Sequence, residues 1–373
     1  MMSTFGKNLV ISVFGQSHAS AIGVTMDGVP AGEPVDLAVL QAFLDRRAPG
    51  QNRMTTQRKE PDAPEVLCGL LDGITCGAPL TAVIRNTDTR SKDYSELADK
   101  PRPSHADFGA DVKYRGWQDV RGGGAFSARL TAPVCIAGGI ALQILERRGI
   151  RIAAHIRSIG QAEDRPFNPM GESEEALCAR LGRTLAVLSD KAEEAMADEI
   201  EVARKEADSI GGTVECMVTG LPVGLGGPLF DGIDGRMAQA LFGIPGVKGV
   251  EFGAGFEAAH IAGSVNNDPL ALDADGDIRP VQNRAGGVAG GMTTGAPMLF
   301  TIALKPTPSI GQPQHTVSLS KHENATLVIK GRHDPCIVVR AVPIVEAVAA
   351  LVVLDALLDA PACFADTPRK ARA

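Results

Sequence analysis

The sequence predicts one large interwoven domain of mixed helices and strands, of the α/β or α+β class. Two observations carry this prediction. Segments with the apolar spacing of strands alternate along the chain with segments of helical spacing, and no low-complexity linker divides the 373 residues. Length alone suggests two or three domains, but single cores of this size are common, so one large core is the default expectation.

The N-terminal part of the sequence predicts a β-hairpin followed by a helix. Apolar and polar residues alternate from Leu9 to Phe14, and a second strand-like run covers Ile22 to Met26, with a Gly-Gln-Ser-His turn between them. Asp36 is a suitable N-cap for the helix that follows. This helix should carry Arg46 and Arg47 at its C-terminal end.

Beyond residue 130 the apolar spacing predicts further helices and strands. The expected helices cover 131–148, 172–188, 191–207 and 345–358, and the expected strands cover 213–219, 298–304 and 326–329. The helix at 345–358 is apolar on almost every side, so we expect it to lie buried in the core.

Neither a membrane span nor a signal peptide is predicted. The longest uncharged apolar stretch near the C-terminus is 347–354, whereas a membrane helix needs about 20 residues. The apolar run at 9–14 is too short for the hydrophobic region of a signal peptide and leads directly into a polar turn. We therefore expect a cytoplasmic protein with no membrane partner.

Composition argues against several classes of function. The chain holds 37 Lys and Arg against 44 Asp and Glu, a net charge of −7, which gives no overall attraction to nucleic acid. Only 4% of residues are aromatic, so a protein that binds polymers on aromatic platforms is not expected. The seven cysteines include no CxxC pair, which favours reduced thiols and predicts no metal site.

Positive charge and glycine are nevertheless concentrated in a few segments. Residues 46–59 contain five cations and no acid, while acidic residues gather in the expected middle helices. Arg121 is followed by three successive glycines and an expected helix, an arrangement that can bind an anion or let the backbone approach another group closely. Residues 286–291 form a second glycine cluster, to which the same reasoning applies.

Two histidines are candidates for proton transfer. His18 and His105 lie in polar turns, each within a Ser-His-Ala tripeptide, and an imidazole suits acid–base work near neutral pH. The alternative is a turn histidine that only satisfies backbone groups. The turns at 305–309 and 331–336 add further cations, an imidazole and a carboxylate. Together these loops predict a small anionic ligand in a site assembled from several segments.

The order of these motifs resembles that of the chorismate synthase family. Eight segments match in sequence and span about Phe5 to Leu358. They are Phe14–His18, Asp45–Pro61, Asn86–Tyr94, Arg102–Asp107, Arg121–Arg129, Asn283–Gly291, Lys305–Thr307 and Gly331–Pro343.

The resemblance implies both an activity and an architecture. The activity is an anti-1,4-elimination of phosphate from 5-enolpyruvylshikimate 3-phosphate, which gives chorismate, leads to the aromatic amino acids and depends on reduced FMN. NADPH is a possible reductant. The implied architecture is an α+β fold, a β-α-β sandwich with a single large core, that assembles as a homotetramer. On this basis residues 1–361 should form the catalytic domain and 362–373 a disordered tail.

The resemblance also implies roles for individual residues. His105 would protonate the leaving phosphate, His18 would keep a proton on the reduced flavin, and Asp334 would help the flavin N5 take the substrate hydrogen. The implied substrate clamps are Arg47, Arg53, Arg129 and Arg332, of which Arg47 and Arg53 are also associated with NADPH. The implied FMN contacts are Ser127, Gly290, Lys305, Pro306, Thr307, Pro308, Ser309 and Arg332.

Some positions depart from the family pattern and leave two other functions open. Gln16, Ala19, Ala125, Phe126 and Pro308 replace the usual residues, and the apolar ring at 126 is expected to weaken flavin affinity. One alternative is therefore an inert protein that binds flavin or a phosphorylated metabolite. The other is a hydrolase with Gly-x-Ser-x-Ala at 15–19 as its nucleophile elbow, which the position beside the N-terminus disfavours.

Overall fold

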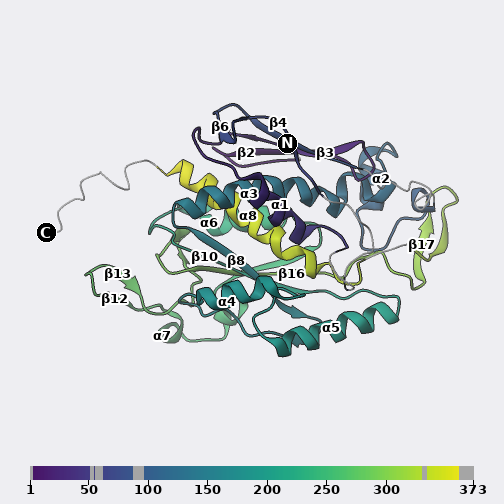
Figure 1. The fold of residues 1–373 in the computed structure, drawn as a ribbon. Helices are drawn as coiled ribbons and strands as arrows, with labels where there is room; N and C mark the ends of the chain where they lie inside the picture. The colour runs from purple at the N-terminus through teal and green to yellow at the C-terminus, as the bar shows by residue number, and fades with distance from the viewer. Residues whose placement is uncertain (1–2, 51–53, 55–61, 87–95, 330–333, 361–373) are drawn as a thin grey trace.

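Two antiparallel sheets enclose a layer of helices in the computed structural model (Figure 1). The structure describes residues 3–50, 54, 62–86, 96–329 and 334–360. The first sheet has the strand order β1 (Thr4–Phe5), β2 (Val10–Gly15), β3 (Ala21–Asp27), β7 (Leu80–Arg85) and β4 (Glu65–Cys68). The second has the order β11 (Val247–Phe252), β16 (Met298–Leu304), β10 (Gly212–Thr219), β8 (Arg151–Ile159) and β9 (Ala162–Glu163).

Four helices fill the space between the sheets (Figure 1). They are α1 (Leu37–Arg47), α3 (Thr131–Arg147), α6 (Ile233–Leu241) and α8 (Val338–Asp359). Two more, α4 (Glu174–Ala179) and α5 (Asp190–Lys205), lie on the outer side of the second sheet. Because every pair of neighbouring strands described in the two sheets is antiparallel, the fold is α+β rather than α/β.

The structure also describes smaller elements outside the two sheets. The two-stranded pairs are β5 (Leu70–Leu71) with β6 (Ile74–Thr75), β12 (Leu270–Leu272) with β13 (Ile278–Pro280), β14 (Val288–Ala289) with β15 (Met292–Thr293), and β17 (Gln314–Ser318) with β18 (Glu323–Leu327). The remaining α-helices described are α2 (Asp107–Tyr114) and the single turn α7 (Gly263–Asn266). Helix α2 and the β17–β18 pair lie at the same end of the molecule (Figure 1).

Most of the elements expected from the sequence are confirmed. The N-terminal hairpin pairs β2 with β3, and the Asp36 side chain caps α1 by accepting from the amides of Ala38 and Val39. The helices expected at 131–148 and 191–207 appear as α3 and α5. The strand expected at 326–329 lies three residues earlier, and the C-terminal helix begins earlier than expected, at Val338.

The helix expected over 172–188 is largely wrong. Helix α4 and a 3-10 turn end at Gly182, and the chain then runs irregularly to Ser189. In this stretch Leu185 and Val187 are both fully buried, and the carbonyl of Ala186 accepts from the amide of Ile156 in β8 at 2.8 Å. Apolar residues two positions apart thus follow the spacing of an extended segment, which the helical interpretation missed.

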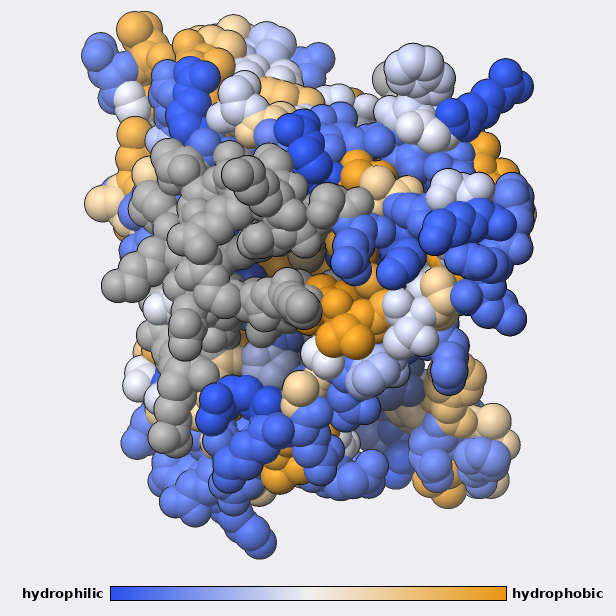
Figure 2. Space-filling view, turned by 90° about the vertical axis from the view of Figure 1, so that its right-hand side faces the viewer, coloured by the Kyte–Doolittle hydropathy of each residue, from blue (hydrophilic) through white to orange (hydrophobic). Residues whose placement is uncertain are grey.

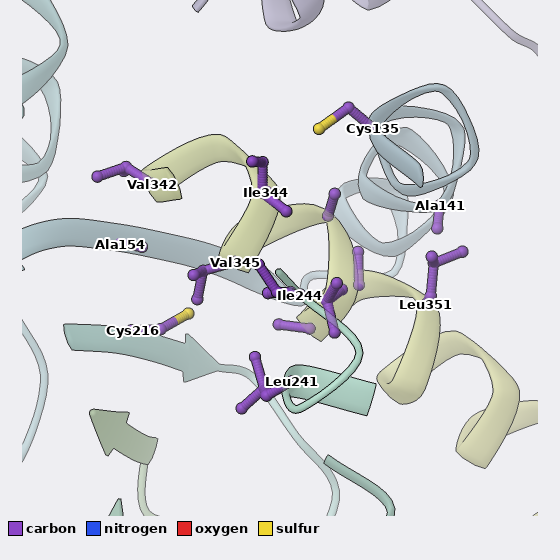
Figure 3. Close-up of a cluster of buried hydrophobic side chains, with 14 of the residues drawn as sticks. Cys135, Ala141, Ala154, Cys216, Leu241, Ile244, Val342, Ile344, Val345 and Leu351 are labelled. Carbon is purple, nitrogen blue, oxygen red and sulfur yellow. The ribbon is translucent and has the colours of Figure 1, made fainter. Parts of the chain in front are cut away.

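Glycine lets three helices of the middle layer approach one another closely. A β-carbon at Gly138 in α3 would lie 2.7 Å from the carbonyl oxygen of Ala347 in α8. At Gly139 it would lie 2.6 Å from the Leu40 side chain of α1. Figure 3 shows the core where side chains of α3 and α8, such as Cys135 and Val345, gather above the second sheet. Helices α1 and α8 can therefore pack directly against α3.

Two helices are long and apolar enough to cross a membrane by length and composition alone. They cover Ala128–Arg147 and Val338–Asp359, and 72% and 89% of their most apolar windows are buried inside the protein. Core helices of globular proteins have the same character. The expectation of a buried helix near the C-terminus is confirmed, because α8 is buried over most of its length.

Helix α8 carries two buried carboxylates that tie distant segments to it. Glu346 accepts from the Nη1 of Arg46 at 2.7 Å and from the amide of Ala154 at 2.9 Å, and it pairs with Arg180 at 3.1 Å. Asp355 accepts from three successive backbone amides, 7–9, at 2.7 to 3.0 Å. These bonds join the last helix to the first sheet, to α1 and to β8.

We expect replacement of Glu346 by Gln to destabilise the fold by about 3 kcal/mol, because the buried guanidinium of Arg180 and the half-buried one of Arg46 lose their counter-charge. Burial would raise the pKa of Glu346, but Arg46 and Arg180 outweigh it and hold the pKa below its usual 4.5. The stabilisation is therefore complete above about pH 4.5 and is lost as the pH falls through the lowered pKa. Urea unfolding at several pH values measures this.

A matched control for this variant is Glu65→Gln, which removes one oxygen of the exposed pair between Glu65 and Arg85. Exposed ion pairs contribute at most about 1 kcal/mol, so this variant should unfold almost like the parent protein. Equal losses in the two variants, or a loss at Glu346 that does not shrink in acid, would contradict the assignment.

Candidate active site

A cavity of about 550 Å³ opens at one end of the helix layer. This end, which carries α2 and the β17–β18 pair, faces the viewer in Figure 2, where hydrophilic side chains surround a smaller apolar area. The cavity is lined by the β2–β3 turn, the C-terminal end of α1, the N-terminal end of α8 and four loops. The loops are 102–106, 122–129, 243–246 and 305–309. Its volume suits a small-molecule ligand.

The triple glycine fits between the two candidate histidines. Gly122, Gly123 and Gly124 all have positive φ, at 59°, 83° and 52°. A β-carbon at Gly122 would lie 2.6 Å from the Nδ1 of His18, and one at Gly123 would lie 3.3 Å from the Cε1 of His105. The close backbone approach expected at this segment is therefore confirmed, and the groups approached are the two imidazoles.

His105 contacts an ion pair. Its Nδ1 lies 2.6 Å from Oδ1 of Asp107, and Arg102 donates to both carboxylate oxygens, from Nε at 2.7 Å and from Nη2 at 2.9 Å. Burial raises the pKa of Asp107, but hydrogen bonds from Arg102 and His105 outweigh it and hold that pKa well below its usual value. Asp107 is therefore an ionised, buried carboxylate beside the imidazole.

Arg47 and Arg129 share one buried carboxylate. Nη1 of Arg47 donates to Asp62 at 2.5 Å, and Nη1 of Arg129 donates to the other oxygen of Asp62, whose side chain is fully buried. The other nitrogens of Arg47 donate to the Thr131 hydroxyl and the Ala128 carbonyl, both at 3.2 Å. Burial would raise the pKa of Asp62, but the two guanidinium charges lower it. This triad forms the cationic side of the cavity.

The third acid of the cavity is held by α8. Arg340 donates from Nη1 to Asp334 at 2.8 Å and from Nε to the carbonyl of Arg47 at 3.0 Å. The same guanidinium thus connects the first turn of α8 with the last residue of α1. The bond from Arg340 fixes Asp334 close to the triad of Arg47, Asp62 and Arg129, because Arg340 also bonds to Arg47.

The segment after β16 supplies one cation and hydroxyls to a cavity that also has apolar lining residues. All five residues from Lys305 to Ser309 line the cavity, and Lys305 donates to the carbonyl of Ser104. Burial, and to a lesser extent Lys248, lowers the pKa of Lys305. Apolar side chains line the cavity as well, namely Phe126, Ile244, Pro245, Ile337 and Ile344. An apolar wall beside a cation and hydroxyls suits a ligand with a flat ring and an anionic group.

The structure brings together most of the residues singled out from the sequence. His18, His105, Asp334, Arg47, Arg129, Ser127 and the residues from Lys305 to Ser309 all line the cavity. Arg53 and Arg332 lie outside the described residues. Two contributors were missed, the buried Asp62 and the Gly-Ile-Pro-Gly loop at 243–246. The positive φ of Gly246, at 97°, is consistent with the turn that its glycine and proline neighbours indicate.

Gly290 is not brought to this cavity. It is exposed, in the turn between β14 and β15. Its neighbours pack against the protein's own backbone, because a β-carbon at Gly286 would lie 2.7 Å from the carbonyl oxygen of Leu299 and one at Gly291 would lie 2.8 Å from the Cα of Gly232. Packing within this chain thus accounts for Gly286 and Gly291, whereas a β-carbon at Gly290 would meet open space.

The hydrolase alternative is wrong. A nucleophile elbow places its serine in a turn between a strand and a helix. Ser17 lies instead in the turn between two strands of an antiparallel hairpin, β2 and β3, and its amide donates to the carbonyl of Gly124 at 3.2 Å.

Comparison with known proteins identifies the family. The family model described as chorismate synthase matches residues 9–358. The chorismate synthase of Thermococcus kodakarensis is 46% identical over 354 residues, which cover 95% of this chain and 97% of the relative. That of Korarchaeum cryptofilum is 44% identical with the same coverage of both chains.

A solved structure supports the same conclusion. A crystal structure of chorismate synthase superimposes with a TM-score of 0.75 at 27% identity, covering 95% of this chain and 93% of that one. Family match, curated relatives and structural likeness all extend over nearly the whole chain. The chain belongs to the chorismate synthase family and is a lyase.

Proposed function

We propose that this protein eliminates phosphate from 5-enolpyruvylshikimate 3-phosphate to give chorismate, with reduced FMN bound in the 550 Å³ cavity. The observation that carries the proposal is the meeting of two histidines, His18 and His105, across a glycine loop in a cavity lined by arginines. Membership of the chorismate synthase family supports the same reaction.

Charge complementarity supports this choice of substrate. The substrate bears a phosphate and two carboxylates, and guanidinium groups bind such anions with paired hydrogen bonds. Arg129 and Arg47 are proposed as its clamps, together with Arg53 and Arg332, which lie outside the described residues. The side chain of Arg129 is 9% exposed and that of Arg47 is 3% exposed, so Arg129 is the more accessible of the described pair.

His105 is the proposed acid for the leaving phosphate. A protonated imidazole beside the cavity can transfer its proton as the C–O bond breaks, and the arginines stabilise the charge that gathers on the departing group. The carboxylate of Asp107 lies 2.6 Å from Nδ1 of the ring.

The residues of the apolar wall and the 305–309 segment fit a flavin. We propose that the hydroxyls of Ser127, Thr307 and Ser309 and the amine of Lys305 contact FMN, with Pro306 and Pro308 shaping the turn and Phe126 against its ring. Bound reduced FMN would supply the electron density on which this elimination depends, with no net redox change. His18 and Asp334 are proposed as the proton-handling groups on this side, Asp334 being fixed by Arg340.

Further ligand contacts, the domain organisation, the assembly and the location are proposed together with this function. Gly290 and Arg332 are retained as FMN contacts by family likeness, and Arg47 and Arg53 as contacts of NADPH, should the protein reduce its own flavin. Two sheets around one helix layer support the family's β-α-β sandwich, with residues 1–361 as one catalytic domain and 362–373, outside the described residues, as a tail. Assembly as a homotetramer and a cytoplasmic location are proposed from the family.

An anaerobic assay tests the reaction itself. Purified full-length protein, supplied with dithionite-reduced FMN and 5-enolpyruvylshikimate 3-phosphate, should release chorismate and inorganic phosphate in equal amounts. Reactions with oxidised FMN should release neither. Tight flavin binding without either product would favour the inert binding protein. Product formation when NADPH is the only reductant would show that the protein reduces its own FMN.

The two histidines provide a sharper test. Replacing His18 or His105 with Ala should lower kcat about 100-fold or more, because each removes a proton-transfer group. His260→Ala is the matched control, because His260 is exposed and follows the 3-10 turn Gly255–Ala259. The kcat of this variant should equal that of the parent. Turnover that survives either active-site change, with reduced FMN supplied, would remove that histidine from the mechanism.

A further inference from the structure

The ion pair beside His105 is rigid and almost fully enclosed. The side chains of Arg102 and Asp107 are 6% and 8% exposed. Arg102 holds both oxygens of Asp107 with Nε and Nη2, its own amide donates to Oδ2 at 3.1 Å, and its Nη1 donates to the Ser309 hydroxyl at 3.2 Å. The carboxylate therefore has a fixed orientation relative to the imidazole.

The donors and acceptors decide which nitrogen of His105 carries a proton. Nδ1 lies 2.6 Å from Oδ1 of Asp107 and 3.1 Å from Nη2 of Arg102. A guanidinium can only donate, and an ionised carboxylate can only accept. An unprotonated Nδ1 would turn its lone pair towards a carboxylate oxygen only 2.6 Å away, which is repulsive, and that contact is shorter than the one to Nη2. Nδ1 is therefore the protonated atom, in the neutral ring as well as in the imidazolium.

The other nitrogen lies on the side of the glycine loop. A β-carbon at Gly123 would lie 3.3 Å from Cε1 and 3.4 Å from Nε2 of His105. His105 itself lines the cavity. With Nδ1 committed to Asp107, Nε2 is the atom through which this ring exchanges protons with a bound ligand.

We propose that Asp107 is a positioning residue that fixes the ring of His105 with Nδ1 protonated, so that Nε2 delivers the proton in the reaction. The step breaks the Nε2–H bond and forms an O–H bond on the departing phosphate, leaving neutral His105 with its proton on Nδ1. The transfer of this proton to the phosphate rests on the proposed function. The assignment of the resting ring's proton to Nδ1 does not depend on that function.

Asp107→Asn tests the inference because Arg102 dictates how the amide is oriented. Oδ2 accepts from both Nε and the backbone amide of Arg102, and neither donor can give up its proton, so the amide oxygen takes the place of Oδ2 and the amide NH2 takes that of Oδ1, facing His105. That NH2 donates to Nδ1 and moves the ring proton to Nε2, and the imidazolium loses its counter-charge. We expect kcat to fall about 100-fold or more, with KM for substrate and the Kd for FMN within about threefold of the parent values.

Glu172→Gln is a matched control. The Glu172 side chain is also 8% exposed and pairs with an arginine, Arg165, at 2.6 Å, but it does not line the cavity. Its kcat should stay within about twofold of the parent value. Asp107→Glu retains a carboxylate and should recover part of the rate that Asp107→Asn loses.

A direct measurement needs no turnover. Solid-state ¹⁵N NMR of protein labelled at the histidine rings reports which nitrogen is protonated, and a His105→Gln sample assigns the resonance. At about pH 8, where an ordinary imidazole is neutral, the parent should show Nδ1 protonated and Asp107→Asn should show Nε2 protonated. Labelled parent protein suffices if the variant does not fold.

The outcomes separate the two proposals. Parent protein with the His105 proton on Nε2, or an Asp107→Asn ring unchanged from the parent, overturns the role of Asp107 whatever the rates. The role of Asp107 is also overturned if the Asp107→Asn variant carries the ring proton on Nε2 and yet has the same kcat as an active parent enzyme. If the parent makes no chorismate, the proposed function fails, while the NMR result still decides whether Asp107 fixes the ring.

Discussion

The close contact of α1, α3 and α8 determines where the cavity lies. The absence of side chains at Gly138 and Gly139 allows the backbone of α8 and the Leu40 side chain of α1 to pack directly on α3. As a result, the C-terminal end of α1 and the N-terminal ends of α3 and α8 meet at the same end of the layer. A β-carbon at Gly138 would meet the backbone of α8 and separate the ends of α3 and α8, so the loops that they carry would no longer converge. The packing of the apolar core thus determines the arrangement of the cavity.

Converging helix ends and loops bring cations together, and the described arginines of the cavity are matched by acids. A buried guanidinium without a counter-charge is costly, so a site rich in arginine needs carboxylates of its own. The described pairs are Arg47 and Arg129 with Asp62, Arg102 with Asp107, and Arg340 with Asp334. These acids keep the arginines in place, so little reorganisation is left for the moment of ligand binding.

Local pattern predicted those parts of the molecule that local interactions determine. The hairpin of β2 and β3, the Asp36 cap and α3 follow from alternation, a capping side chain and helical spacing within a few residues. Asp62 could not be found in this way, since its partners lie 15 and 67 positions away along the chain. The two glycine clusters look alike in sequence, yet one faces imidazoles and the other faces backbone, which only tertiary packing distinguishes.

The bonds from Asp355 to the amides of residues 7–9 have a consequence for biosynthesis. They join the turn between β1 and β2 to α8, 346 to 348 residues later, so this turn lacks its anchor until the C-terminal helix has left the ribosome. Throughout translation the apolar faces of α3 and of the second sheet lack α8, which packs against both. A nascent chain of this protein is therefore a natural client for chaperones, and a truncation before α8 would release an aggregation-prone fragment rather than a smaller enzyme.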